Sequence, residues 1–149
     1  RLSIVKMTVD HWIEASEKAQ DGQLKDIKEI GQLDVESSLA DNLEGYTVLG
    51  EGGEVLACIG VQEVDEDTAY AWTIMVADIG ARLIGITRCV RIWLDGCGYK
   101  HVMADVREEF IEGQRWAELL GFVPIGVIES YYEDGGDAIK YRRETSWVH

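Results

Sequence analysis

The sequence predicts a protein of the α/β (α+β) class, on three observations. Short apolar or alternating runs, which are typical of β-strands, recur along the 149 residues. Among them lie two segments with helical spacing of apolar or small residues, 81–97 and 109–120. Turns rich in glycine separate these segments, and no proline- or serine-rich linker or internal repeat divides the chain. We therefore predict a single domain over residues 1–149, large enough to bury one core.

The N-terminal third predicts a strand followed by helices. Residues 2–7 form a short, partly alternating strand. Thr8 or Asp10 can then cap a helix over residues 11–20, in which Trp12 and Ile13 are expected to contact the core. The apolar spacing in the following segment, residues 24–44, predicts one or two further short helices.

Three strands are predicted next, over residues 46–50, 54–64 and 68–76. The Glu-Gly-Gly sequence at residues 51–53 predicts a hairpin between the first two strands. Gly60 lies within the second strand, where a glycine indicates a β-bulge or a close approach of another backbone. An acidic turn separates the second strand from the third.

The second half predicts alternating helices and strands. These elements are a helix over 81–97, a strand over 100–106, a helix over 109–120, and strands over 122–128 and 138–143. In the strand over 100–106, His101, Met103 and Asp105 alternate with the apolar residues Val102, Ala104 and Val106. This two-residue period is typical of a strand. Gly121 is expected to end the second helix in a left-handed conformation. Trp116 and Phe122 are expected to be buried.

The charge of the chain bears on its function. Its formal net charge is −14, which opposes sequence-independent binding to nucleic acid or to anionic membranes, because both need a basic face. The same charge is compatible with a solubilising surface, or with a basic partner or cationic amine substrate. Ten acidic residues and three lysines lie between positions 10 and 44. This segment predicts either a solvated acidic face or a groove for a basic partner.

The cysteines and histidines predict no disulfide and no metal site. Cys58, Cys89 and Cys97 are odd in number and lack C-x-x-C spacing, so we expect reduced thiols in a cytoplasmic protein. The histidines show no metal-ligand spacing. No signal peptide is evident, and no apolar run reaches the roughly 18 residues that indicate a membrane-spanning helix.

Three sequence motifs resemble those of a known family. W-A-E-L-L-G-F at 116–122 resembles the A-x-x-x-Y-x-x-x-G-F ending of the GNAT superfamily of acyl-CoA N-acyltransferases. The order of the predicted elements is also similar to the GNAT order. I-T-R-x-x-R-x-W-L at 86–94 and G-x-R-W-A-x-L-L-G-F at 113–122 resemble small bacteriophage GNAT-like proteins more closely, including internal virion proteins. The resemblance implies a mixed, strongly twisted sheet of six to seven strands with helices on both faces.

The resemblance also implies acetyl-CoA, or another acyl-CoA, as co-substrate and a primary amine of a small molecule or basic protein as acceptor. The pantetheine arm would bond to strand backbone as an added strand would, and the pyrophosphate would bind the N-terminus of the next helix. The residues implied are Thr73, Ile74, Met75 and Val76 for the pantetheine, and Ile79, Gly80, Ala81 and Arg82 for the phosphates.

The phosphate loop departs from the family pattern Q/R-x-x-G-x-G/A. One alignment starts the loop at Asp78, where a carboxylate would repel phosphate by about 1 kcal/mol. Asp78 would instead serve as a helix N-cap if this segment binds no phosphate. A second alignment matches residues 82–87 but lies one turn deeper in the predicted helix. Both alignments stay open.

The catalytic positions depart as well. Ala117 occupies the position of the tyrosine that many GNAT enzymes use as general acid, and Phe110 that of an asparagine. The candidate general base for the amine is Glu63, near the end of its strand, or a water molecule held there. Tyr131 and Tyr132 are candidate acids by proximity, or else half-buried aromatic residues. The chain is therefore either an N-acetyltransferase of the cytoplasm, or a GNAT-fold bacteriophage protein without that activity, in the virion or host cytoplasm.

Overall fold

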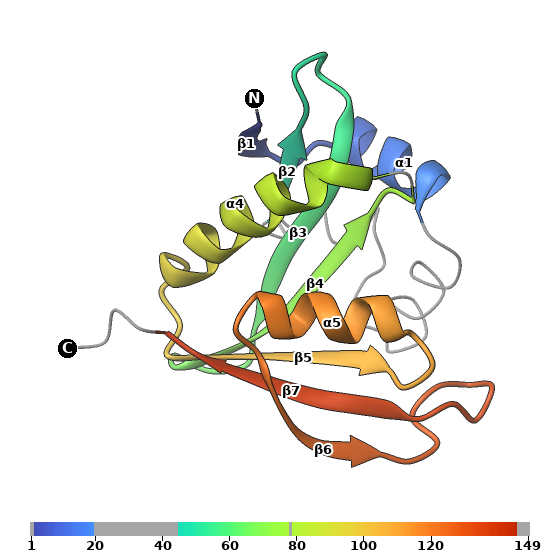
Figure 1. Cartoon of the computed structure of the whole chain (residues 1–149). Helices are drawn as coiled ribbons and strands as arrows, with labels where there is room; N and C mark the ends of the chain where they lie inside the picture. The colour runs from blue at the N-terminus through green and yellow to red at the C-terminus, as the bar shows by residue number, and fades with distance from the viewer. Residues whose placement is uncertain (1, 20–44, 78, 146–149) are drawn as a thin grey trace. The chain divides into compact units, whose positions relative to one another are not determined.

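The computed structural model describes residues 2–19, 45–77 and 79–145, which form an α/β protein (Figure 1). Its elements are β1 (Ser3–Lys6), α1 (Val9–Lys18), β2 (Gly45–Leu49), β3 (Val55–Glu63), β4 (Thr68–Met75), the 3₁₀-helix η1 (Gly80–Arg82), α4 (Leu83–Asp95), β5 (His101–Arg107), α5 (Ile111–Leu119), β6 (Val123–Ile128) and β7 (Ala138–Glu144). The predicted class is confirmed. The helices predicted over 24–44 lie outside the described residues.

The strands of the described segments form one mixed sheet in the order β1-β2-β3-β4-β5-β7-β6. β1, β2 and β3 pair antiparallel, whereas β4 and β5, which α4 connects, pair in parallel. β7 pairs antiparallel with both β5 and β6, so the last strand of the chain lies between its two predecessors. The predicted mixed sheet of six to seven strands is confirmed.

The chain divides into two compact units. Unit 1 comprises Arg1–Gln62 and Trp72–Cys89, and unit 2 comprises Glu63–Ala71 and Val90–His149. Unit 1 thus holds β1, α1, β2, all of β3 except Glu63, residues 72–75 of β4, η1 and residues 83–89 of α4. Unit 2 holds the β3–β4 turn with the first residues of β4, and everything after the middle of α4. The prediction of a single domain stays a prediction.

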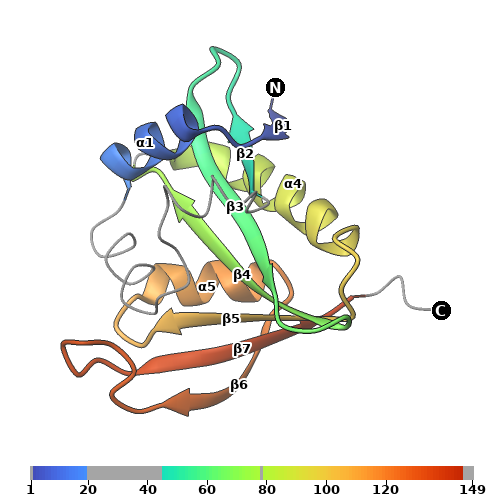
Figure 2. The ribbon, with the colours of Figure 1, turned by 180° about the vertical axis from the view of Figure 1, so that it is seen from behind.

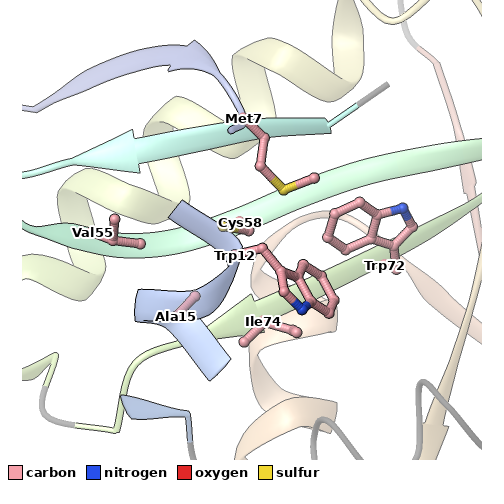
Figure 3. Close-up of a cluster of buried hydrophobic side chains, with 7 residues drawn as sticks. All are labelled: Met7, Trp12, Ala15, Val55, Cys58, Trp72 and Ile74. Atoms are coloured by element: carbon pink, nitrogen blue, oxygen red, sulfur yellow. The ribbon is translucent and has the colours of Figure 1, made fainter. Parts of the chain in front are cut away.

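In unit 1, α1 packs on β3 and β4 through a cluster of buried apolar side chains (Figure 3). The rings of Trp12 in α1 and Trp72 in β4 meet edge to face, with centroids 5.7 Å apart and planes at 71°. The first half of α4, residues 83–89, lies on the opposite face of β2 and β3 (Figures 1 and 2). Helices therefore cover both faces of these strands, as expected.

The start of α1 shows why the helix begins where it does. Oγ1 of Thr8 accepts the backbone N–H of His11 at 3.1 Å, and Nδ1 of His11 accepts the backbone N–H of Thr8 at 3.2 Å. This reciprocal capping box satisfies two N–H groups that a helix start leaves unpaired. Thr8, rather than Asp10, is therefore the N-cap. Ile13 was expected to contact the core, but it is 48% exposed because it follows Trp12 onto the outer side of the helix.

The predicted hairpin between β2 and β3 is confirmed, but its irregularity lies elsewhere than expected. The register shifts between Val48 and Leu49, whereas Gly60 pairs in register with Gly45. Gly45 approaches the side chain of Met7 so closely that an added Cβ would lie 2.6 Å from its Cε. A side chain at Gly45 would therefore displace Met7 from the buried cluster.

In unit 2, α5 covers one face of β5 and β7. A Cβ added to Gly113 of α5 would lie 3.1 Å from Cγ1 of Val106 in β5. Nε of Arg143 in β7 donates to the carbonyl of Leu120 at 2.7 Å. Gly121 has a φ of +97°, the left-handed conformation predicted for the residue that ends this helix.

The prediction for Trp116 is wrong, and the prediction for Phe122 is confirmed. Phe122 is 5% exposed, whereas the side chain of Trp116 is only partly buried. The buried positions of α5 are instead Ala117 and the following Leu120. Trp116 precedes Ala117 by one residue, or about 100° of helix rotation, and so lies at the border of the buried face.

Candidate functional site

The end of β4 supplies the first part of the predicted site. The backbone N–H of Val76 donates to the carbonyl of Leu56 in β3 at 3.1 Å. Backbone groups of successive strand residues point to alternate edges, so Ile74 shares this direction. Thr73 and Met75 direct their backbone groups to the other edge, away from β3. Thr73 therefore has the orientation that an added strand of ligand would need, whereas the end of α1 lies along the same edge beyond Met75.

The end of α1 fixes the chain where it leaves β4. Val76 forms an isolated antiparallel bridge with Ala19. The next N–H, that of Ala77, donates to the carbonyl of Lys18 at 2.7 Å. The path from β4 toward η1 is therefore set by contacts within unit 1.

The turn before α4 contains the predicted phosphate residues. Gly80 opens η1 with a φ of +55°, a conformation that favours glycine. The N–H of Arg82 donates to the carbonyl of Ile79 at 3.3 Å, and the N–H of Leu83 donates to that of Gly80. Ile79 is buried, whereas Gly80, Ala81 and Arg82 are exposed. An anion can thus reach backbone at a helix start, where N–H groups and the helix dipole favour negative charge.

The α-helix begins at Leu83, two residues later than predicted, because η1 precedes it. The second alignment of the phosphate loop, residues 82–87, therefore lies mostly in the first turn of α4. Its glycine, Gly85, packs against Leu2, where an added Cβ would lie 2.9 Å from Cδ1. This packing is sufficient to explain a glycine at position 85. Asp78, on which the first alignment depends, lies outside the described residues.

Arg82 has an acidic partner. Its Nη1 lies 3.1 Å from Oε2 of Glu54, and its Nε donates to the carbonyl of Ile79 at 3.3 Å. The Arg82 and Glu54 side chains are 41% and 40% exposed, so water weakens this ion pair. Oε1 of Glu54 also accepts the N–H of Gly52 at 2.9 Å. A phosphate at η1 would have to compete with the Glu54 carboxylate for the Arg82 guanidinium.

Glu63, the candidate base, lies in unit 2 at the end of β3. Its side chain is exposed, and its Oε1 accepts the hydroxyl of Tyr99 at 2.7 Å. The N–H of the next residue, Val64, donates to the carbonyl of Thr68 at 2.9 Å. Glu63 therefore lies beside the beginning of β4, where the hairpin turns.

The two candidate acids differ in their surroundings. The hydroxyl of Tyr131 donates to Oδ2 of Asp105 at 2.9 Å. Burial, followed by the charge of Asp105, raises the pKa of Tyr131 well above its usual range, so the phenol keeps its proton. Tyr132 is buried, with its ring 5.0 Å from that of Tyr131 and the guanidinium of Arg107 4.1 Å from its centroid. Tyr132 thus packs as an aromatic residue, whereas Tyr131 belongs to a polar cluster.

This polar cluster, the Asp105 cluster, consists of Tyr70, Asp105, Tyr131 and Lys140. Asp105 in β5 lies directly opposite Lys140 in β7, and Nζ of Lys140 donates to the hydroxyl of Tyr70 in β4. Burial raises the pKa of Asp105 although Tyr131 and Lys140 both act to lower it. The hydrogen bond to Tyr70 raises the pKa of Lys140. Sequence reasoning missed this cluster, although an aspartate inside a strand is itself an unusual signal.

Comparison with known proteins gives no match in sequence but many matches in structure. No protein-family model matches the chain. No curated protein matches it in sequence either. Solved structures, in contrast, match it over nearly its whole length. The ribosomal-protein-S18-alanine N-acetyltransferase of Escherichia coli superposes with a TM-score of 0.72 at 18% identity, covering 100% of this chain and 97% of that one.

Two further structures have a bound coenzyme. A spermidine N-acetyltransferase from Vibrio cholerae, in complex with CoA and spermine, has a TM-score of 0.71 at 14% identity and coverage of 97% and 96%. A GNAT family acetyltransferase from Elizabethkingia anophelis, with acetyl-CoA bound, has a TM-score of 0.66 at 14% identity and coverage of 96% and 97%. The chain has the GNAT fold. Identities this low show the fold alone, because one fold supports many functions.

The structure shows the surroundings of Ala117 and Phe110, the two residues that depart from the GNAT catalytic pattern. Ala117, at the position of the GNAT tyrosine, is 5% exposed in α5. Phe110, at the position of the asparagine, packs against Gly113, where an added Cβ would lie 2.5 Å from its Cδ2. Neither side chain can exchange a proton, so any acid that this chain uses must come from another residue.

The remaining predictions concern thiols, metals and membranes. Cys58, Cys89 and Cys97 are free, as predicted, and burial raises the pKa of Cys58 to about 11. Within residues 2–19, 45–77 and 79–145, no three His, Cys, Asp or Glu side chains lie together as metal ligands would. None of the helices described is long and apolar enough to cross a bilayer.

Proposed function

We propose that this chain is a GNAT-type N-acyltransferase that transfers an acetyl or other acyl group from its CoA thioester to a primary amine. The observation that carries the proposal is the fold, which N-acetyltransferases share over nearly the whole chain. Two of the similar structures hold CoA or acetyl-CoA, which supports a CoA thioester as co-substrate here.

The proposed acyl-CoA site lies in unit 1. The pantetheine arm bonds, in the manner of an added strand, to the edge of β4 that faces away from β3, where Thr73 directs its backbone groups. Met75 is the last β4 residue of this predicted contact. The other two predicted residues, Ile74 and Val76, direct their backbone groups toward β3 and hold the end of β4 against it. The pyrophosphate binds exposed backbone at η1, between the predicted residues Ile79, Gly80, Ala81 and Arg82. Arg82 contributes its charge only in competition with Glu54.

The proposed reaction needs an amine that has lost its extra proton. The ammonium gives one proton to a base, and the nitrogen lone pair then forms a bond to the thioester carbonyl carbon. The carbon–sulfur bond breaks, and the second amine proton ends on the sulfur, so the products are an amide and a free thiol. Glu63 is one candidate base. Tyr131 could act as the acid only after its hydroxyl leaves Asp105, and Tyr132 only if its buried ring became accessible.

The proposed acceptor is a cationic amine, of a small molecule or of a basic protein. A formal net charge of −14 attracts cations and raises their concentration near the surface. The similar structures include enzymes named for spermidine and for the alanine of a ribosomal protein, both of which are amines. We place the protein in the cytoplasm, where acyl-CoA and such amines are both present.

A thiol-release assay tests this function. The chain is incubated with acetyl-CoA and, in turn, spermidine, an alanine-ended peptide, a lysine peptide and the corresponding alcohols. We expect free thiol to appear in proportion to one of the amines, with the acetylated amine detected by mass, and none with the alcohols. Release that is independent of any amine, or absent throughout the panel, would contradict an N-acyltransferase.

A second candidate is a GNAT-fold bacteriophage protein of the virion or of host interaction, without acetyltransferase activity. Two observations favour it: Arg82 is paired with Glu54, and Ala117 replaces the usual acid. In that case the exposed backbone at η1 binds no acyl-CoA pyrophosphate. Failure of acetyl-CoA to bind at all would favour this candidate.

A further inference from the structure

β6, in unit 2, is an uncovered strand at one edge of the sheet. Among the described strands it pairs with β7 alone. Figures 1 and 2 show α5 lying along β5, and no element of unit 2 beyond β6. Five of its six residues are exposed, and the sixth is partly exposed. One row of backbone N–H and C=O groups along β6 is therefore open to another chain.

The sequence of β6 lacks the charges that protect most open edges. Residues 119–128 include no charged side chain, although 28% of the residues in the whole chain are charged. Val123, Ile125 and Val127 are 59%, 45% and 58% exposed. Edge strands usually carry a charged side chain, such as lysine, that opposes pairing with a second strand. β1, at the other edge, has this protection, because it is only four residues long and ends in Lys6.

The apolar side chains of β6 lie on both faces of the sheet. Val123 pairs with Arg142 of β7. Val127 pairs with Ile139 of the same strand. Paired residues share a face, and Arg142 and Ile139, three positions apart in β7, lie on opposite faces. Val123 and Val127 therefore also lie on opposite faces, because the register shift in the middle of β6 inserts one residue. A helix docked on one face would cover only one of them, whereas a strand added at the edge contacts both.

We propose that β6 binds β6 of a second copy of this chain as an antiparallel strand, so that the sheet continues across a two-fold axis. The occupant is a strand, because it must contact both faces, and it is uncharged, because β6 has no charged side chain to pair with a charge. Of the two described edge strands, only β6 is itself uncharged. An antiparallel pair of identical strands closes on itself, so the assembly is a dimer rather than a filament. The inference does not depend on the proposed function.

Pro124 limits the strength of this dimer. Proline occurs within a sheet where its missing N–H is not needed, so the Pro124 nitrogen faces the open edge and offers no donor there. The register shift beside Pro124 also bends the strand. A strand of this length spans about 20 Å, and its pairing covers less than the roughly 800 Å² per partner found in stable complexes. We therefore expect a dimer that forms at high concentration and dissociates on dilution.

The net charge of the chain determines how salt acts on the dimer. Two copies that each carry a formal charge of −14 repel one another at long range, whereas the strands that meet are uncharged. Salt screens this repulsion. The dimer should therefore strengthen as salt is added, which is the opposite of what a basic partner bound by charge would show.

Sedimentation velocity of the whole chain, from micromolar to millimolar concentration, tests the dimer. We expect a shift from monomer to dimer as concentration rises, and a larger shift in high salt. Val127→Lys places a charge at the edge and should weaken the dimer about tenfold or more. Ile92→Lys, at a side chain of α4 that is 68% exposed, changes the net charge equally and is the matched control, which should associate like wild type. A wild-type chain that stays monomeric, that dissociates as salt is added, or that grows beyond a dimer would overturn the proposal.

Pro124→Val tests strand pairing itself. It restores an N–H donor to the open edge at two symmetric places in the dimer, so it should strengthen the dimer about fivefold or more. In wild type, amide hydrogen exchange in β6 should slow as concentration rises, because pairing protects the outward N–H groups. Val127→Lys should remove this protection while its melting temperature stays near that of wild type. Association that Pro124→Val does not strengthen, or that leaves exchange in β6 unchanged, would arise elsewhere on the surface and overturn the proposal.

Discussion

Nη1 of Arg82 lies 3.1 Å from Oε2 of Glu54, so the arginine nearest the proposed phosphate site is already held by a carboxylate. Both side chains are about two-fifths exposed, which makes the pair weak and open to exchange. A phosphate with two charges is a stronger partner for a guanidinium than one screened carboxylate. The pair therefore predicts opposite effects on affinity for its two members.

We expect Arg82→Ala to weaken acetyl-CoA binding about five- to thirty-fold, which is roughly 1–2 kcal/mol, because it removes one charge from the phosphate site. Glu54→Gln should strengthen binding a few-fold, since it releases Arg82 without adding a charge. Calorimetric titration measures both. Arg88→Ala, which removes an exposed charge from the same helix, is the matched control and should change little; an Arg82 variant that behaves like it would show that Arg82 does not contact phosphate.

The buried tryptophan of β4, rather than that of α5, should dominate stability. Trp72 is 5% exposed and packs edge to face with Trp12, so Trp72→Ala should cost about 3–5 kcal/mol of unfolding free energy. Trp116→Ala should cost clearly less, because that side chain is only partly buried. Urea denaturation of both variants checks the order, and a larger loss at Trp116 would contradict the packing described for α5.

Glu14 should make the unfolding free energy of the protein depend on pH in the acidic range. Its Oε2 accepts the N–H of Val55 at 2.9 Å and the Nζ of Lys18 at 3.1 Å, and these contacts, the first above all, hold the pKa of Glu14 below its ordinary 4.5. A depressed carboxyl pKa stabilises the fold above 4.5, and the contribution is lost as pH falls through the folded value. Glu14→Gln should therefore be less stable than wild type at pH 7.

The difference between Glu14→Gln and wild type should shrink below pH 4.5 and vanish once Glu14 is protonated in both states. Unfolding free energies measured between pH 3 and 7 follow this change. A difference that is constant over that range would mean that the Glu14 charge contributes nothing.

The three cysteines should differ in reactivity. Burial raises the pKa of Cys58 to about 11, and its Sγ lies among Thr47 and the carbonyl of His11. At pH 8 almost none of it is thiolate, the reactive form. A chromogenic disulfide reagent should label the partly exposed Cys89 and Cys97 in the native protein, and Cys58 only after unfolding. Fast labelling of Cys58 in the folded state would contradict its burial beside α1.

Much of the fold could be predicted from local signals. The alternation in β5, the helical spacing before Gly121 and the left-handed conformation of Gly121 depend on neighbouring residues, so the sequence indicates them directly. The position of β7 between β5 and β6 could not be predicted, because strand pairing depends on contacts between distant segments. The burial of Trp116 was predicted wrongly because its position in the helical spacing lies at the border between the buried and the exposed face of α5.

The site was less predictable than the fold. Asp105 was recognised as a strand residue, but its partners Tyr70, Tyr131 and Lys140 come from three other segments that only the sheet register brings together. Tyr131 was chosen for its proximity to a strand end, and its hydrogen bond to Asp105 could not be inferred from that. The Arg82–Glu54 pair likewise joins the helix start to a hairpin far away in the chain.

Titration of acetyl-CoA into the wild-type chain by calorimetry tests the central claim most directly, because every proposed step begins with binding of this co-substrate. The account predicts saturable heat with one site per chain, weakened by Arg82→Ala and strengthened by Glu54→Gln. No saturable heat with millimolar acetyl-CoA would contradict the account and leave the GNAT fold of this chain without acyltransferase chemistry.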